Sequence, residues 1–140
     1  MILVDTNVLV ALADERDALH GQASRDARSL GRGPFGVTSL VLGEVCFLLP
    51  DRYLRSRLRF MLEHLPIEPV EPGPPWWPAV FAWLERYADH DPDLADAQLA
   101  VLSAEIPSAQ VWTYDREFRT VWKRPDGTAI PLATRSRGPR

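Results

Sequence analysis

Hydrophobic and polar residues follow one another in blocks that predict short strands and amphipathic helices. Residues 2–4 form an aliphatic run of the kind that fills a buried strand. Residues 6–15 then place their aliphatic side chains on one helical face, and Thr6 or Asn7 can cap that helix. The chain therefore opens with a predicted strand followed directly by a helix, and Asp5 stands between them.

The same alternation continues to the end of the chain. Further helices are predicted at residues 17–30, 39–49, 51–65, 77–89 and 94–105. Extended segments are predicted within residues 33–39 and at 67–70, 109–114 and 129–132, with a turn at 115–118. Strands that alternate with helices predict an α/β fold in which helices flank a central, mainly parallel sheet.

The predicted helix at 39–49 is apolar on nearly every side, which indicates a buried helix. Cys46 lies among these apolar residues, so we expect it to be a small buried hydrophobic side chain. It is the only cysteine and has no partner for an internal disulfide, which fits a reducing cytoplasm. The apolar runs are short and interrupted by Asp5 and Glu44, so we expect neither secretion nor membrane insertion.

Length and charge narrow the picture further. The chain has 140 residues, of which 46% are hydrophobic, and this fits one folded domain. The net charge is -3, yet seven of the 16 lysines and arginines follow Asp115. This acidic body with a basic end permits a polyanionic partner, although a basic segment that only aids solubility explains it equally well.

Two aspartates directly follow predicted strands. Asp5 follows residues 2–4, and Asp115 follows residues 109–114. Ligands of open parallel sheets bind beyond the carboxyl ends of the strands, so these two carboxylates could meet at one edge of the sheet. Each also has a purely structural explanation, because an aspartate can cap a helix, as at Asp5, or form a turn, as at Asp115.

Two further acids lie in predicted helices. Glu44 is the only charged residue within 39–49, and burying an unpaired carboxylate is unfavourable by several kcal/mol, so it needs an arginine or a cation as partner. Asp96 lies in the first turn of the helix at 94–105, where Asp93 can be the N-cap and the helix dipole favours a negative charge. A site for hard divalent cations, with either one ion or two, would explain all four acids together. Carboxylate oxygens suit Mg²⁺ or Mn²⁺, and no histidines or cysteines have zinc spacing.

Four segments together resemble a known family. These segments are "ILVDTNVLVAL", "VTSLVLGEV", "DLADAQLAVLSA" and "VWTYDREF". In this order and spacing the sequence resembles the PIN-domain nucleases, and specifically the VapC-like toxins of bacterial toxin-antitoxin pairs. The resemblance implies catalytic and metal-binding roles for Asp5, Glu44, Asp96 and Asp115, supported by Thr6, Asn7 and Thr113.

The resemblance also implies an organisation and an activity. We expect one PIN-like nuclease domain at residues 1–133 and a flexible basic tail at 134–140. The implied activity is Mg²⁺-dependent hydrolysis of RNA, with Mn²⁺ as a substitute, by a cytoplasmic endoribonuclease toxin. The implied partners are RNA, a small antitoxin protein and a second copy in a homodimer, with no membrane. Arg116 and Arg119 are candidates for phosphate contacts, and solvated surface arginines are the alternative.

Two other functions stay open at this point. A non-catalytic PIN-like module could bind RNA or protein. A phosphohydrolase of the haloacid dehalogenase type also begins with a strand-terminal aspartate, but it needs a second aspartate where Asn7 stands and a later lysine, and Lys123 is the only lysine.

Residues 72–78 are rich in proline and tryptophan. In the helix that follows, we expect a stripe of Trp77, Phe81 and Leu84 to pack on the core, while Trp76 is exposed. An interface with an antitoxin or a second copy is the other interpretation, because aromatic residues are enriched at such surfaces.

Overall fold

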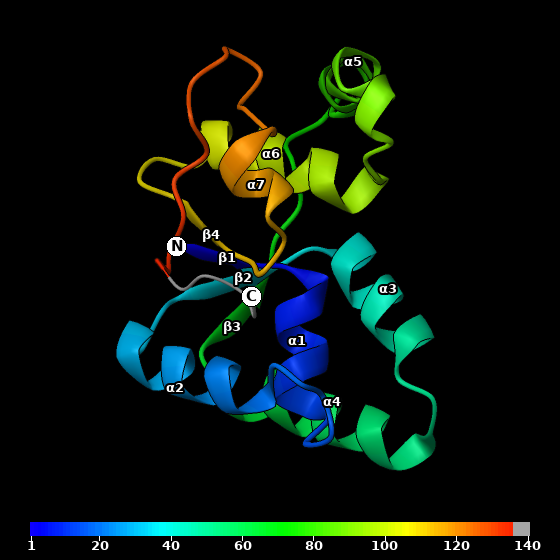
Figure 1. Ribbon diagram of the computed structural model, residues 1–140, viewed down its shortest axis with the longest axis vertical. Coiled ribbons are helices and arrows are strands. Elements are labelled where there is room, and N and C mark those ends of the chain that lie inside the picture. The colour runs from blue at the N-terminus through cyan, green and yellow to red at the C-terminus, as the bar shows by residue number, and fades with distance from the viewer. Residues whose placement is uncertain (136–140) are drawn as a thin grey trace.

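Residues 1–135 are described by a computed structural model (Figure 1). The predicted tail at 134–140 therefore lies outside the described residues from position 136 onward. The elements, in chain order, are β1 (Ile2–Val4), α1 (Thr6–Ala13), α2 (His20–Leu30), β2 (Phe35–Val37), α3 (Ser39–Leu48), α4 (Arg52–His64), β3 (Ile67–Pro69), α5 (Trp77–Arg86), the 3₁₀ helix η1 (Ala88–His90), α6 (Leu94–Glu105), β4 (Gln110–Trp112) and α7 (Glu117–Thr120).

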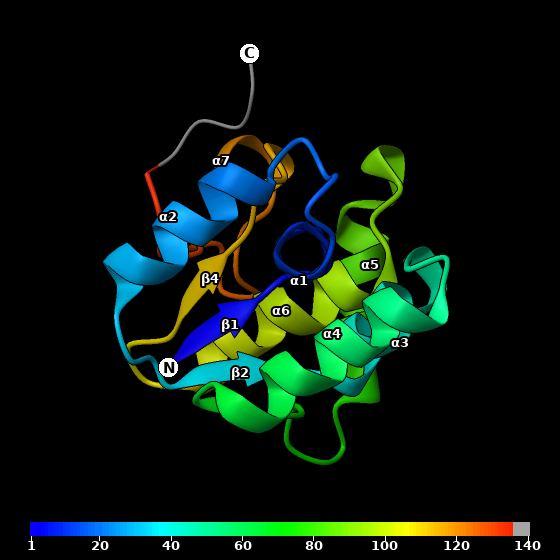
Figure 2. The same cartoon turned by 90° about the horizontal axis from the view of Figure 1, so that it is seen from below.

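The four strands form one parallel sheet in the order β3-β2-β1-β4. Helices α1, α2 and α4 lie on one side of it, and α5, α6 and α7 lie on the other (Figures 1 and 2). Helix α3 contacts both α1 and α6 at the edge of these two layers. The predicted α/β fold with a parallel sheet flanked by helices is therefore confirmed.

The strand order places a crevice between β1 and β4. The chain leaves β1 through α1 on one side of the sheet, whereas it enters β4 from α6 on the other side. The helices at this point diverge, so the carboxyl ends of β1 and β4 stay open to a ligand. Val4 pairs with Trp112, which brings the next residues, Asp5 and Thr113, level with each other.

The core lies between the sheet and both helical layers. Leu3, Val8 and Leu9 are at most 1% exposed to solvent. Val111, in the adjacent strand β4, is fully buried. Helix α6 is buried over most of its length, because its alanines and leucines face both α5 and the sheet. The core holds the strand ends in fixed positions, so side chains that follow them have little freedom.

Helix α3 is less buried than the sequence predicts. Val41 and Val45 are fully buried, but Cys46 is exposed and Phe47 is 88% exposed. The prediction of a helix buried on most sides, with Cys46 as a buried side chain, was wrong. The helix lies at the edge of the two layers, so only one of its faces is covered and apolar side chains remain on the other.

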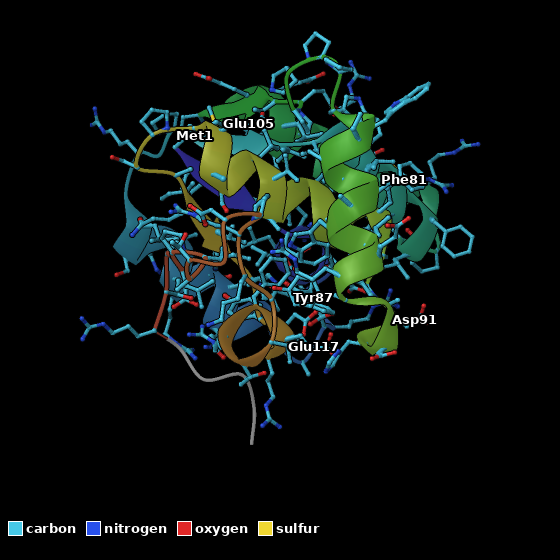
Figure 3. All side chains as sticks on the ribbon, turned by 90° about the horizontal axis from the view of Figure 1, so that it is seen from above. Met1, Phe81, Tyr87, Asp91, Glu105 and Glu117 are labelled. Atoms are coloured by element: carbon cyan, nitrogen blue, oxygen red, sulfur yellow. The ribbon has the colours of Figure 1, made fainter. Side chains whose placement is uncertain are left out.

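Helix α5 packs on a different stripe from the predicted one. Val80 and Trp83 are buried, whereas Trp77 is 66% and Phe81 55% exposed, and Figure 3 shows Phe81 pointing away from the fold. Trp76, which we expected to be exposed, is half-buried against the core. The indole of Trp83 donates to the Lys123 carbonyl at 2.7 Å, so the buried face of the helix contacts the segment that follows α7.

Three local predictions also change. Asp5, rather than Thr6 or Asn7, is the N-cap of α1. Residues 117–120 form the short helix α7 where a turn was expected. The strand expected at 129–132 is reduced to isolated bridges, one of which joins Leu132 to Val111. Among the described residues, no helix is long and apolar enough to cross a bilayer.

We predict that Leu9→Ala lowers the free energy of unfolding by about 3 kcal/mol, because it leaves a cavity in a fully packed region. Phe47→Ala removes a larger side chain but should change stability by less than about 0.5 kcal/mol, because that ring is in water. Urea denaturation of both variants measures the difference. A loss of similar size for Phe47→Ala would contradict the placement of α3.

Candidate active site

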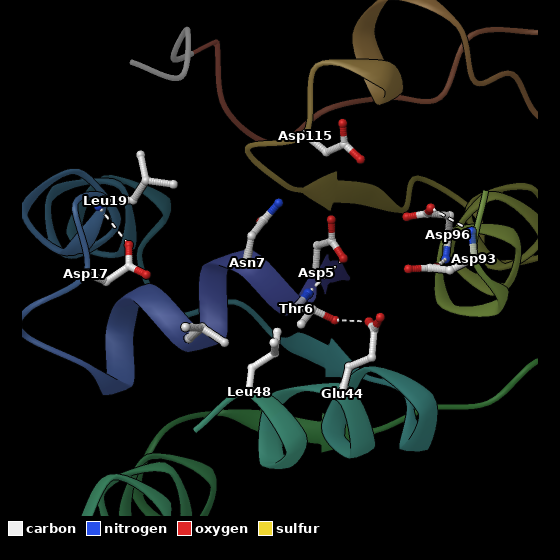
Figure 4. Close-up of a pocket in the computed structure, with 11 residues that line it drawn as sticks. Asp5, Thr6, Asn7, Asp17, Leu19, Glu44, Leu48, Asp93, Asp96 and Asp115 are labelled. Atoms are coloured by element: carbon white, nitrogen blue, oxygen red, sulfur yellow. Dashed lines mark hydrogen bonds between the residues drawn. The ribbon is translucent and has the colours of Figure 1, made fainter. Parts of the chain in front are cut away.

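A cavity of about 340 Å³ opens at the carboxyl ends of β1 and β4. Figure 4 shows the residues around it. The cavity is lined by Asp5, Thr6, Asn7, Val10, Asp17, Leu19, Glu44, Leu48, Asp93, Asp96 and Asp115. All four acids singled out from the sequence are among these residues, and they come from four separate parts of the chain. The fold therefore gathers the carboxylates that the strand pattern suggested could meet.

Asp5 is the buried centre of this group, with only 5% exposure. The hydroxyl of Thr113 donates to its Oδ2 at 2.6 Å, and the Thr6 N–H donates to its Oδ1 at 2.7 Å. The backbone N–H of Asp5 itself donates to the Trp112 carbonyl at 3.0 Å. The carboxylate is thus fixed from β4 and from the start of α1, and it acts as helix cap and cavity wall together.

Glu44 reaches the cavity from the second turn of α3. Thr38 caps that helix by accepting from the Val41 N–H at 3.1 Å, directly after β2. Thr6 donates its hydroxyl to Glu44 Oε2 at 2.6 Å, so α1 holds the glutamate. Within the described part of the chain Glu44 has no ion pair, and the arginine partner weighed from the sequence is not found there.

Asp115 follows β4 and is held by the turn that leads into α7. Its N–H donates to the Thr113 hydroxyl oxygen at 3.0 Å, and its Oδ1 accepts from the Glu117 N–H at 3.0 Å. The amide oxygen of Asn7 accepts from the Tyr114 N–H at 3.2 Å. Asn7 therefore joins the start of α1 to the segment that carries Thr113 and Asp115.

Asp93 and Asp96 form a capping box at the start of α6. Asp93 Oδ1 accepts from the Asp96 N–H at 2.8 Å, and Asp96 Oδ2 accepts from the Asp93 N–H at 3.2 Å. The helix-capping role proposed for this region is real, but it does not remove the acids from the site. The box fixes both carboxylates on the wall of the cavity, at the positive end of the helix dipole.

Every charged side chain that lines the cavity is acidic, and no lysine, arginine or histidine of the described residues lines it. Burial raises the pKa of Asp5 to about 6, against the opposing hydrogen bonds from Thr113 and Thr6. Burial, followed by the charges of Asp93 and Asp5, raises the pKa of Asp96 to about 8.

The pKa of Glu44 is raised as well. Burial is the main cause that raises its pKa, and the hydrogen bond from Thr6 opposes it. The charge of Asp93 and a hydrogen bond with that carboxyl group raise the pKa further. Such a group of carboxyls gains stability from any positive charge that enters the cavity.

A family comparison decides the identity of the fold. The PIN domain model matches residues 2–123, which is most of the chain and includes all four carboxylates. The chain belongs to the PIN-domain family. PIN domains are typically nucleases that act on nucleic acids and generally use divalent metal ions such as Mg²⁺.

The chain was also compared with solved structures and with curated proteins. The solved structure of PAE2754 from Pyrobaculum aerophilum is 20% identical, with a TM-score of 0.47, over 83% of this chain and 75% of that chain. A search of curated proteins finds no match.

The donors of this PIN domain suit a hard divalent cation, because carboxylate and hydroxyl oxygens dominate the cavity wall. As they are placed, no three Asp, Glu, His or Cys side chains within residues 1–135 stand close enough together to hold an ion. The acids must therefore turn toward a shared point before they can coordinate. Asp5 accepts hydrogen bonds at both carboxylate oxygens. Glu44, Asp96 and Asp115 accept the backbone or hydroxyl hydrogen bonds described above at one oxygen each, so the adjustment falls to these three.

The two candidate arginines lie outside the cavity. Arg116 is exposed at the start of α7, and Arg119 donates to the Thr134 carbonyl at 3.1 Å. Neither is among the lining residues. Two lining acids, in contrast, were not proposed as site residues from the sequence. Asp93 could have been included, because a capping box places its two members together, whereas the position of Asp17 depends on a loop that no pattern predicts.

We predict that Asp96→Asn stabilises the protein above about pH 6 when EDTA is present. The native pKa of Asp96 is raised from 3.8 to about 8, so the unfolded chain loses this proton first and stability falls as the pH rises from about 4 to 8. The substitution removes this loss, and we expect a gain on the order of 2 kcal/mol at pH 8.

Thermal unfolding between pH 5 and 9 measures this effect. Asp89→Asn, an exposed acid outside the cavity, is the matched control and should leave the pH dependence unchanged. An Asp96→Asn protein that loses stability with pH as steeply as the wild type would show that the carboxyl group is not under electrostatic stress.

Proposed function

We propose that this PIN domain is a metal-dependent endoribonuclease in which Asp5, Glu44, Asp96 and Asp115 hold the metal ion. One observation carries the proposal: acids that follow β1 and β4 and acids of α3 and α6 line one cavity, and within residues 1–135 no basic side chain lines it. A structural role would pair these charges with arginine or lysine, because unpaired buried carboxylates are unfavourable. A ligand of positive charge accounts for all of them.

The residues of the chain have distinct tasks in this proposal. Asp5 is the fixed ligand, because Thr113 and Thr6 hold both its oxygens in place. Thr6 also sets the direction of Glu44, so one residue aligns two ligands. Asn7 accepts a hydrogen bond from the Tyr114 N–H and so ties the segment after β4 to the start of α1. When bound, Mg²⁺ or Mn²⁺ supplies a water of lowered pKa and positive charge beside the phosphodiester.

RNA as the substrate rests on the resemblance to VapC-like toxins. Attack by water does not use the ribose 2'-hydroxyl, so the chemistry would serve RNA or DNA alike. We propose a cytoplasmic toxin that cuts RNA, with a small antitoxin that blocks it. Arg116, which is exposed just beyond Asp115, remains a candidate for a phosphate contact, and Arg119 could contribute after its bond to Thr134 is exchanged.

A second cavity supports the antitoxin as a partner. This groove, of about 610 Å³, lies between α1, α2 and α4 and is lined mainly by apolar side chains, including Leu12, Phe60 and Met61. Helix α4 also carries four arginines, at positions 52, 55, 57 and 59. An amphipathic antitoxin helix with acidic residues beside its apolar face matches both features. The exposed side chains of Trp77 and Phe81 on α5 support a homodimer, because aromatic residues are enriched at protein interfaces.

We predict that Asp5→Asn slows RNA cleavage by roughly 100-fold or more, since even outer partners of metal sites contribute roughly 10- to 100-fold. The amide keeps an oxygen for Thr113 or Thr6, so the variant should fold and its circular dichroism should match the wild type. Cleavage of a labelled RNA with Mn²⁺ is the measurement, and Asp89→Asn is the control of unchanged activity.

EDTA should stop cleavage by the wild type, and added Mg²⁺ or Mn²⁺ should restore it. Cleavage that resists EDTA, or an Asp5→Asn variant that cuts at the wild-type rate, would overturn the assignment. RNA binding without any cleavage by the wild type would favour the non-catalytic module instead.

The toxin role has its own test in growing cells. Induced wild-type protein should arrest growth, whereas induced Asp5→Asn should not, because only the former cuts RNA. If a small protein is encoded beside this one, its coexpression should relieve the arrest. Equal growth with both proteins, at equal expression, would contradict a toxin while leaving the nuclease proposal in place.

A further inference from the structure

The cavity extends beyond the acids that could hold a metal. Figure 4 shows Asp93 and Asp96 at one end of it and Asp17 with Leu19 at the opposite end. Asp17 and Leu19 belong to the loop between α1 and α2, which is remote from the strand ends in sequence. Asp17 and Leu19 therefore line a part of the cavity that the proposed metal chemistry does not use.

Asp17 is held rigidly by its own loop. Its Oδ1 accepts from the Leu19 N–H at 2.8 Å, and its backbone N–H donates to the Asp14 carbonyl at 3.0 Å. The His20 N–H donates to the Asp17 carbonyl, also at 3.0 Å. Within the described residues Oδ2 takes part in no hydrogen bond, so this half-buried carboxylate keeps acceptor capacity on the cavity wall.

Three aliphatic side chains line the same cavity: Val10 from α1, Leu19 from the loop and Leu48 from the end of α3. Figure 4 shows Leu19 beside Asp17, and Leu48 between the two ends of the cavity. Leu48 is 54% exposed, so part of its side chain is open to a ligand. These three side chains supply apolar surface against which a flat ring can pack.

Charge limits which group can enter. The charged residues that line the cavity are all acidic, so an anionic group gains nothing beside Asp17. A favourable ligand must donate hydrogen bonds to Asp17 and present an apolar face to the leucines. A nucleobase does both, because its ring is flat and its Watson–Crick edge carries N–H donors.

We propose that Asp17, Val10, Leu19 and Leu48 form a subsite for one base of the RNA, with guanine as the preferred base; this rests on the proposed nuclease function. Guanine presents two adjacent donors, N1–H and the N2 amino group, to a carboxylate. Uracil has one donor, flanked by two carbonyl oxygens that the carboxylate repels. The carboxylate at position 17 therefore sets the base preference beside the cleaved bond.

A random-sequence RNA pool tests the preference. The wild type with Mn²⁺ should enrich guanine at one fixed position relative to the cut. Replacement of that guanosine by inosine, which lacks the N2 amino group, should slow cleavage about tenfold. Asp17→Asn should shift the preference toward uracil, because Oδ1 still accepts from Leu19 while the new amide donates to a base carbonyl.

Asp14→Asn is the matched control, since Asp14 lies at the start of the same loop but does not line this cavity. It should leave the base preference as in the wild type. A wild-type enzyme that cuts without preference at any position, or an Asp17→Asn variant with the wild-type preference, would overturn the subsite. Either result would leave metal-dependent cleavage intact.

Binding separates the two proposals when no cleavage is seen. Guanosine 5'-monophosphate with Ca²⁺ should shift the methyl NMR signals of Leu19 and Leu48 at lower concentration than inosine 5'-monophosphate does, and Asp17→Asn should remove the difference. That result in a protein that cuts no RNA would keep the subsite and overturn the nuclease. Equal binding of both nucleotides would overturn the subsite.

Discussion

The hydrogen bond from Thr113 to Asp5 is the contact on which the rest of the site depends. It joins β1 to β4 where the strand order reverses, and it exists because Val4 pairs with Trp112 one step earlier in the sheet. A shift of one residue between these strands would turn Thr113 to the other face. The burial of Leu3 and Val111 excludes such a shift, so core packing positions the carboxylate.

From this contact the other acids follow in turn. Asp5 caps α1 by accepting from the Thr6 N–H, which also fixes the position of Thr6. The Thr6 hydroxyl then orients Glu44 on α3. The fold thus assembles negative charge against its own electrostatic preference, as the raised pKa values of Asp5 and Asp96 show. The packed core compensates for this unfavourable term, and a cation would remove it.

The sequence was informative wherever a residue is placed by the chain next to it. Asp5 and Asp115 follow strands, and strands of a parallel sheet end at one edge, so their meeting could be predicted. Helix α3 was misjudged because an apolar segment does not show which of its faces the fold will cover, and Phe47 lies on the uncovered one. Asp17 enters the cavity through the tertiary placement of a loop, which periodicity does not encode.

Calorimetric titration of Mn²⁺ tests the central claim most directly, because it measures the protons that leave the carboxyl groups as a cation binds. In two buffers of different ionisation enthalpy at pH 7, the account predicts binding whose heat depends on the buffer, since Asp96 with a pKa of about 8 must release its proton. Binding with the same heat in both buffers, or no binding at all, would contradict a cation site built from strained carboxyl groups.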